Sequence, residues 1–124
     1  MVTARMGLFE VTVGVGRIGA AELTPVTALV DTGAAHSVMP ESLLAKHGIA
    51  PLEYRSFAIT GGSEVEYGYG MAQFGIDGRE FPCPVIFGVD GEFLLGATTL
   101  QIFNLMVDPA EERLVTKPLR ARSI

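Results

Sequence analysis

Asp31 is the residue whose surroundings most favour chemistry. It ends the apolar run 28–30 and is followed by Thr32, Gly33 and Ala34. A carboxylate at the mouth of a buried strand can take up and release protons during catalysis. It can equally act as a turn residue that accepts hydrogen bonds from the following amides. For an isolated Asp-Thr-Gly, both interpretations stay open.

A second pattern with chemical meaning lies upstream. Gly14, Gly16 and Gly19 have the G-x-G-x-x-G spacing of dinucleotide-binding loops. Asp31 follows Gly14 by seventeen positions, where a ribose-binding carboxylate could stand. That fold requires a helix after the third glycine, but only the stretch AAELTPV separates Gly19 from the next strand, and its Pro25 does not fit a helix interior. The glycines therefore favour a turn between two antiparallel strands.

The composition fits one domain with a buried core. The chain has 124 residues, of which 48% are hydrophobic, so we expect a single domain over residues 1–124. Met6-Gly7 offers an alternative start, and residues 1–5 are expected to be dispensable. The net charge is −5 and the basic residues form no stripe, which argues against nucleic acid or a membrane surface as a partner.

Neither the cysteine nor the histidines have the spacing of a metal or cofactor site. Cys83 is the single cysteine, lies between two prolines and is expected to fill space in the core. His36 and His47 lack metal-ligand spacing, so we expect no metal ion and no cofactor. The sequence shows neither the apolar run of a signal peptide nor a span for a bilayer, so a cytoplasmic location is expected.

The elements that must position Asp31 are mostly strands. Alternating and β-branched residues predict strands in the segments 8–15, 26–30, 54–60, 64–76, 79–88, 104–108 and 113–119. Helices are predicted near 40–47, which Gly48 ends, and near 97–103, where Leu100 and Phe103 share a face. Many short strands with glycine turns and two short helices predict a mainly β fold, a small closed or nearly closed β-barrel.

In this setting the segment ALVDTGAAHSVMP, residues 28–40, resembles the active-site segment of aspartic proteases. The resemblance is to the single-domain, retropepsin-like branch, which includes retroviral proteases. The second mark of that family is two apolar residues and a glycine before the C-terminal helix, and Leu94-Leu95-Gly96 matches it. The resemblance extends from Met6 to about Leu119 and implies the small closed β-barrel of this family, with Leu94-Leu95-Gly96 packed behind the active-site loop.

The resemblance implies an aspartic endopeptidase that hydrolyses peptide bonds. In this chemistry two carboxylates share one proton, so that one activates a water molecule and the other polarises the peptide carbonyl. The chain contains one Asp-Thr-Gly, so catalysis requires a C2 homodimer with Asp31 from each subunit at the axis. Thr32 matches the residue whose hydroxyl bonds across the two halves. Gly33 and Ala34 match the small residues that let backbone N–H groups approach the carboxylates.

The same resemblance assigns a role to the segment FAITGGSEVEYGYG, residues 57–70. It is similar to the flap, a glycine-tipped hairpin that folds over bound substrate. Thr60, Gly61 and Gly62 at its tip are therefore expected to contact a peptide or protein substrate.

Two positions depart from the retroviral pattern. Retroviral members usually carry an acidic residue two positions after the motif glycine and an arginine directly after the second glycine; here these are Ala35 and Ala97. Both partners of that charged pair are missing together, which points to a cellular or prokaryotic relative. The alternative interpretation is a catalytically weak or inactive domain of the same fold that acts as a peptide-binding or assembly module.

Overall fold

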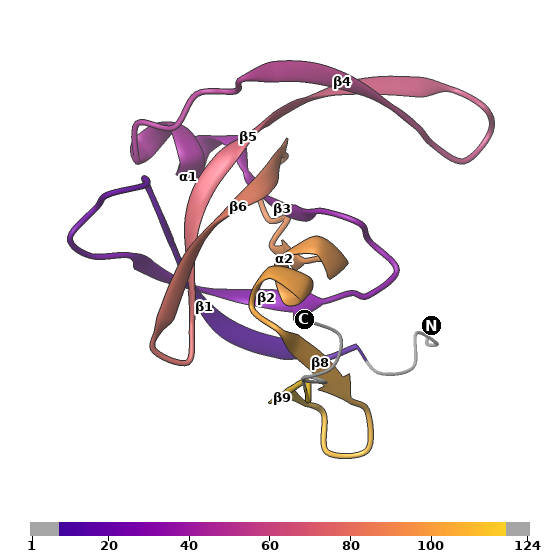
Figure 1. Cartoon of the computed structure of the whole chain (residues 1–124). Coiled ribbons are helices and arrows are strands. Elements are labelled where there is room, and N and C mark those ends of the chain that lie inside the picture. The colour runs from indigo at the N-terminus through magenta and orange to yellow at the C-terminus, as the bar shows by residue number, and fades with distance from the viewer. Residues whose placement is uncertain (1–7, 119–124) are drawn as a thin grey trace, which may run out of the picture.

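Nine strands and two short helices occupy residues 8–118, the part of the chain that the computed structural model describes (Figure 1). The helices are α1 (Glu41–Lys46) and α2 (Ala97–Ile102). The strands are β1 (Glu10–Gly16), β2 (Thr24–Val30), β3 (Ser37–Pro40), β4 (Glu53–Ala58), β5 (Glu64–Ile76), β6 (Arg79–Gly88), β7 (Leu94–Leu95), β8 (Leu105–Asp108) and β9 (Arg113–Thr116). The fold is mainly β, as the alternation of the side chains predicts.

Six of these strands close into a barrel. They pair in the order β1-β2-β7-β3-β6-β5, and a further pairing of β1 with β5 closes the ring. β4 lies outside the ring, at the edge formed by β5. The length of β5, 13 residues, allows both arrangements, because its first part pairs with β4 and its last part pairs with β1. The prediction of a small closed β-barrel is confirmed.

The barrel is filled by every second side chain of its strands. In β5, each alternate residue from Gly68 to Ile76 is buried, whereas the residues between them are partly exposed. Val13 and Val15 of β1 follow the same rule. Leu44 of α1 and Leu100 of α2 join the same buried cluster. Burial on one face and water on the other fixes the register of each strand.

The glycine pattern at 14–19 forms a turn between antiparallel strands, as predicted. Gly14 and Gly16 lie in β1, which pairs antiparallel with β2. The amide of Ala20 donates to the carbonyl of Arg17 at 2.9 Å and closes the turn. Residues 17–23, all described by the structure, contain no helix, so the arrangement that holds a dinucleotide does not form here.

Both predicted helices are present, with slightly narrower bounds. α1 begins at Glu41, because Pro40 is the last residue of β3 and stands at the N-cap position, where it makes no side-chain hydrogen bond to the helix. Gly48 follows the end of α1, and its amide donates to the Ala45 carbonyl at 2.9 Å. α2 ends one residue earlier than predicted. In the described part of the chain, neither helix has the length and apolar character to cross a membrane.

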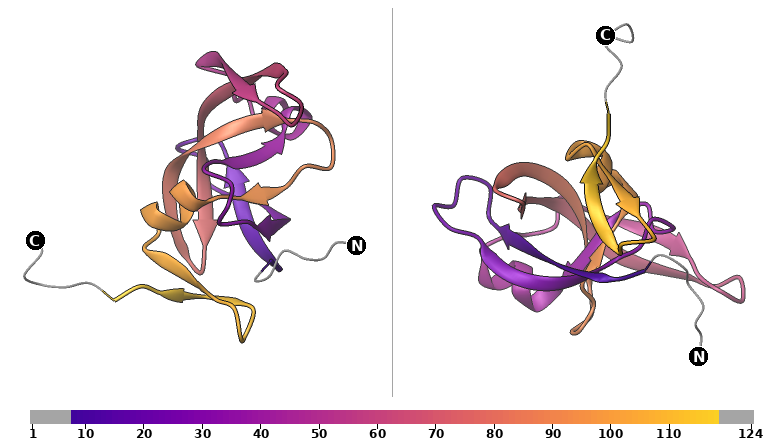
Figure 2. Two further views of the ribbon diagram at one scale, coloured as in Figure 1. Left: turned by 90° about the vertical axis from the view of Figure 1, so that its right-hand side faces the viewer. Right: turned by 90° about the horizontal axis from the view of Figure 1, so that it is seen from below.

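β8 and β9 form a separate two-stranded sheet beside the barrel (Figures 1 and 2). Val107 and Leu114 face each other in this sheet and pack against the barrel core. Met106 and Val115 form the neighbouring pair, and alternation places them on the opposite face. The segment 1–5 that we expect to be dispensable, and both ends of the family resemblance, lie outside the described residues.

Cys83 offers a direct test of how tightly the barrel is packed. Its side chain is fully buried, and burial raises the pKa of its thiol to about 11. At pH 8, about one thiol in a thousand would then be ionised in the folded chain, against about one in four in the unfolded chain. Because the thiolate is the reactive form, we expect DTNB to label the native protein at least about 100-fold more slowly than the denatured protein.

The labelling is followed by absorbance, with Cys83→Ala as the blank in both conditions. Native and denatured rates that agree within a factor of about three would contradict the buried placement of this side chain.

Candidate active site

Asp31 stands at the end of a strand that is held on both sides. β2 pairs antiparallel with β1 and parallel with β7, where Leu29 faces Leu94. The amide of Asp31 donates to the Leu95 carbonyl at 3.0 Å. Its side chain is only 8% exposed. Because the backbone at Asp31 is held on both sides, its carboxylate keeps a defined position. Proton transfer to a bound molecule requires such a position.

The loop after Asp31 folds back onto the carboxylate. The amide of Gly33 donates to Asp31 Oδ1 at 2.9 Å, and the amide of Ala34 donates to the Asp31 backbone carbonyl at 3.1 Å. A Cβ on residue 33 would lie 3.2 Å from Oδ1, so a glycine at this position makes it easier for the Gly33 amide to approach the carboxylate. Asp31 is thus a turn residue whose carboxylate is oriented by the turn. Thr32 is exposed, and its bond across two subunits stays a prediction.

Gly96 lies directly behind this loop. A Cβ on Gly96 would come within 2.5 Å of the carbonyl carbon of His36, a distance that no side chain tolerates. The amides of the next two residues donate to the carbonyls of Ala34 and Ala35 at 2.8 and 2.9 Å. Two backbone bonds therefore join the segment at Ala97 to the loop. The expected packing of Leu94-Leu95-Gly96 behind the loop is present.

The segment predicted as a flap forms a hairpin between β4 and β5. Thr60, Gly61 and Gly62 lie in its exposed loop, and the two glycines have φ angles of +95° and +84°. The amide of Ile59 donates to the Ser63 carbonyl at 2.9 Å and closes the loop. In Figure 1 this hairpin and the loop between β2 and β3 extend to the same side of the barrel. The contact of the tip with substrate stays a prediction.

An apolar pocket joins the hairpin to the loop that follows Asp31. Its volume is about 240 Å³, and its lining comes from that loop, from β3, from the hairpin and from β6: Ala34, Ala35, His36, Val38, Phe57, Tyr67 and Ile86. The Phe57 and Tyr67 rings lie 5.9 Å apart across the hairpin. Sequence analysis did not single out Phe57, Tyr67 or Ile86. Alternation places each on a strand face, but only the folded chain shows which face borders the pocket.

His36 of the pocket lining and Arg55 of β4 both contact the ring of Tyr69. The His36 ring packs edge-on against Tyr69 at 5.5 Å, and the Arg55 guanidinium lies 3.6 Å from the centre of the same Tyr69 ring. A hydrogen bond to Glu53 raises the pKa of Arg55, which keeps it cationic. Tyr69 therefore connects the hairpin to the loop after Asp31. Over residues 8–118, no group of three or more His, Cys, Asp or Glu is placed to hold a metal ion.

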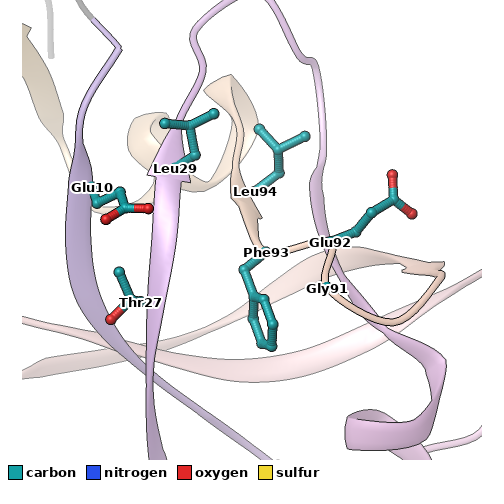
Figure 3. Close-up of a pocket in the computed structure, with 7 residues that line it drawn as sticks. All are labelled: Glu10, Thr27, Leu29, Gly91, Glu92, Phe93 and Leu94. Atoms are coloured by element: carbon teal, nitrogen blue, oxygen red, sulfur yellow. The ribbon is translucent and has the colours of Figure 1, made fainter.

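A second hollow, of about 400 Å³, lies beside β1, β2 and β7 (Figure 3). It is lined by Glu10, Thr27, Leu29, Gly91, Glu92, Phe93 and Leu94. Leu29 precedes Asp31, which directly follows β2, by two positions, and Glu10 and Leu94 are the direct partners of Leu29. Figure 3 shows Leu29 and Leu94 side by side, with Glu10 and Glu92 on the two flanks. The hollow therefore has an apolar centre and carboxylates at its sides.

The close contact at Gly96 leads to a stability prediction. Gly96→Ala forces a methyl group into backbone atoms of His36, so we expect the free energy of unfolding to fall by at least about 2 kcal/mol. Gly91→Ala is the control, because nothing lies within 4 Å of its Cβ and only its φ of +90° opposes alanine. The control should lose about 1 kcal/mol. Urea denaturation at one protein concentration measures both, and equal losses would contradict the contact.

Two solved structures of retroviral proteases have a fold similar to that of this chain. The EIAV protease complexed with the inhibitor HBY-793 has a TM-score of 0.60 and 21% identity, with 82% of this chain and 94% of that chain covered. The solution structure of the Simian Foamy Virus (mac) protease has a TM-score of 0.58 and 18% identity, with 77% and 94% covered. At these identities the likeness concerns the fold, and it confirms the predicted retropepsin-like barrel.

Sequence comparison adds the family. No curated protein matches the chain. Residues 19–102 match the family described as gag-polyprotein putative aspartyl protease, and this span includes the Asp31 loop, the hairpin and Leu94-Leu95-Gly96. The cellular or prokaryotic branch stays a prediction. With more than half of its length matched and the corresponding barrel in place, the chain belongs to the gag-polyprotein aspartyl protease family.

Proposed function

We propose that the chain is an aspartic endopeptidase whose active site is completed by a second copy of itself. The placement of Asp31 is the observation that carries this proposal. Its carboxylate is buried at the end of β2, is oriented by the Gly33 amide, and lies on a loop supported from behind by Gly96. Membership of an aspartyl protease family supports the same chemistry.

The second carboxylate would come from another chain. Besides Asp31, the aspartates of the sequence are Asp77, Asp90 and Asp108. Asp77 and Asp90 lie in turns, and Asp108 forms an ion pair with Arg113 between β8 and β9. A two-fold axis beside the exposed loop after Asp31 would bring two copies of this carboxylate together, one from each subunit.

The chemistry requires one proton on the pair. The ionised carboxylate accepts a proton from water as the water oxygen attacks the peptide carbonyl carbon, and the protonated carboxyl donates its proton to the carbonyl oxygen. A tetrahedral diol results. It collapses when the protonated carboxyl gives its proton to the nitrogen, one diol hydroxyl gives its proton to the ionised carboxylate, and the C–N bond breaks, so that the pair again holds one proton. Activity is therefore expected on the acid side of neutrality and lost when both carboxylates are ionised.

A peptide substrate would lie between the Asp31 loop and the β4–β5 hairpin. The apolar pocket beside Ala34 would receive an apolar side chain, because burying such surface is favourable. Thr60, Gly61 and Gly62 at the hairpin tip would cover the peptide, as a flap does. The hollow at Leu29 would receive a further side chain, and its carboxylates would repel an acidic one.

Subunit mixing tests the composite site. Asp31→Asn preserves shape and hydrogen bonding but cannot share a proton, so a subunit that carries this substitution should inactivate any wild-type partner. In an equal mixture with full exchange, about one quarter of the dimers carry two aspartates. Activity per total protein should therefore fall to about a quarter of the wild-type value, with a quadratic dependence on the wild-type fraction.

Peptide cleavage rates across a series of mixing ratios provide the measurement, and mass spectrometry confirms exchange. A straight line, with about half of the activity in the equal mixture, would mean that each chain carries its own complete site. Binding of a statine-type transition-state analogue without any cleavage would favour the peptide-binding module instead.

The carboxylates of the hollow lead to a prediction about substrate charge. Glu10→Gln and Glu92→Gln remove negative charge beside Leu29, and the glutamine oxygen at position 92 can still accept the Val89 amide. For peptides with an acidic residue next to the scissile bond, kcat/KM should rise about two- to five-fold at low salt, whereas neutral peptides should be unaffected. Glu41→Gln on α1 is the matched control. Equal effects on both peptides would contradict the electrostatic role.

A further inference from the structure

We infer that Ser37 and Thr99 are positioning residues, which fix the catalytic loop by holding Gly96 in place. This inference rests on the proposed function, since it assigns to two buried hydroxyls the task of setting the position of Asp31. Neither residue borders the pocket or the hollow described above.

The two hydroxyls form a closed pair inside the protein. Ser37 begins β3 and Thr99 lies in α2, and their oxygens are 2.6 Å apart. Both side chains are fully buried; with Asp31, they are the buried polar residues of the described chain. An apolar side chain of similar size would be easier to bury than a hydroxyl. The hydroxyls therefore contribute directed bonds at this point rather than burial alone.

Hydrogen bonds extend from this pair on both sides. The Gly96 amide donates to Ser37 Oγ at 3.0 Å, and either hydroxyl can be the donor in the bond between Ser37 and Thr99. The Thr99 hydroxyl in turn hydrogen-bonds the Cys83 sulfur and lowers the pKa of that thiol against the larger effect of burial. The Cys83 thiol donates to the Phe81 carbonyl at 3.6 Å. A row of hydrogen bonds thus links β6, α2 and β3 to Gly96.

The residues on both sides of Gly96 hydrogen-bond the segment that carries Asp31. The residue before it, Leu95, accepts the Asp31 amide, and the residue after it, Ala97, donates to the Ala34 carbonyl. These bonds hold the loop at its first residue and near its middle. A displacement of Gly96 would therefore move both attachment points of the loop. The alanines at 35 and 97 have no side-chain polar group with which to replace this support.

Two substitutions at one position separate positioning from packing. Thr99→Val keeps the shape but removes the hydroxyl, whereas Thr99→Ser keeps the hydroxyl but removes a methyl group from the core. If the hydroxyl positions Asp31, Thr99→Val should lower kcat about ten-fold or more, with KM for a peptide changed less than two-fold. Thr99→Ser should keep kcat within about two-fold of wild type although it leaves a small cavity. Kinetics are measured at a temperature where urea denaturation shows both variants folded.

The inference would be overturned if Thr99→Val and Thr99→Ser had the same kcat. It would also be overturned if kcat fell in both variants in proportion to their loss in free energy of unfolding. A second measurement does not depend on turnover. Amide hydrogen exchange at Asp31 and Gly33, read by NMR, should be at least about five-fold faster in Thr99→Val than in Thr99→Ser. If the wild-type protein cleaves no peptide, the proposed function fails, while unequal exchange would still show that Thr99 holds the loop and equal exchange would refute it.

Discussion

One contact between two backbones governs the rest of this structure, that of Gly96 with the loop after Asp31. The space between them is too small for any Cβ, and the neighbouring amides bond directly to the loop. β7, α2 and the end of β2 therefore have to meet at one point. The barrel supplies a stiff frame for this contact, and backbone hydrogen bonds at Asp31 and Ala34 attach the loop to it.

Features set by residues adjacent in the sequence could be predicted from it. The apolar run before Asp31 predicts a buried strand, and Thr32-Gly33 predicts the turn that now bonds its carboxylate. Gly61-Gly62 predicts the tip of a hairpin, and Gly48 the end of α1. A local feature also separates the pattern at Gly14–Gly19 from a nucleotide site, because the connection that follows it is short and contains a proline.

Features set by distant residues could not be predicted in this way. β7 has two residues, too few for any periodicity, and its place between β2 and β3 depends on parallel pairing across the chain. Thr99 has the sequence context of an ordinary helix residue, and its partner Ser37 lies 62 positions away. Phe57 and Tyr67 alternate like any strand residues, and only the closure of the barrel assigns them to the pocket wall.

The parallel pairing of β2 with β7 also has a consequence for biosynthesis. Leu29 and Leu94 are 65 positions apart, so during translation the Asp31 segment leaves the ribosome well before the residues that support it. Local hairpins such as β5–β6 can form early, whereas this long loop closes late because its ends must first be brought together. A nascent chain that stops short of residue 98 lacks the support for its carboxylate. The carboxylate therefore reaches its final position only after most of the chain has been made.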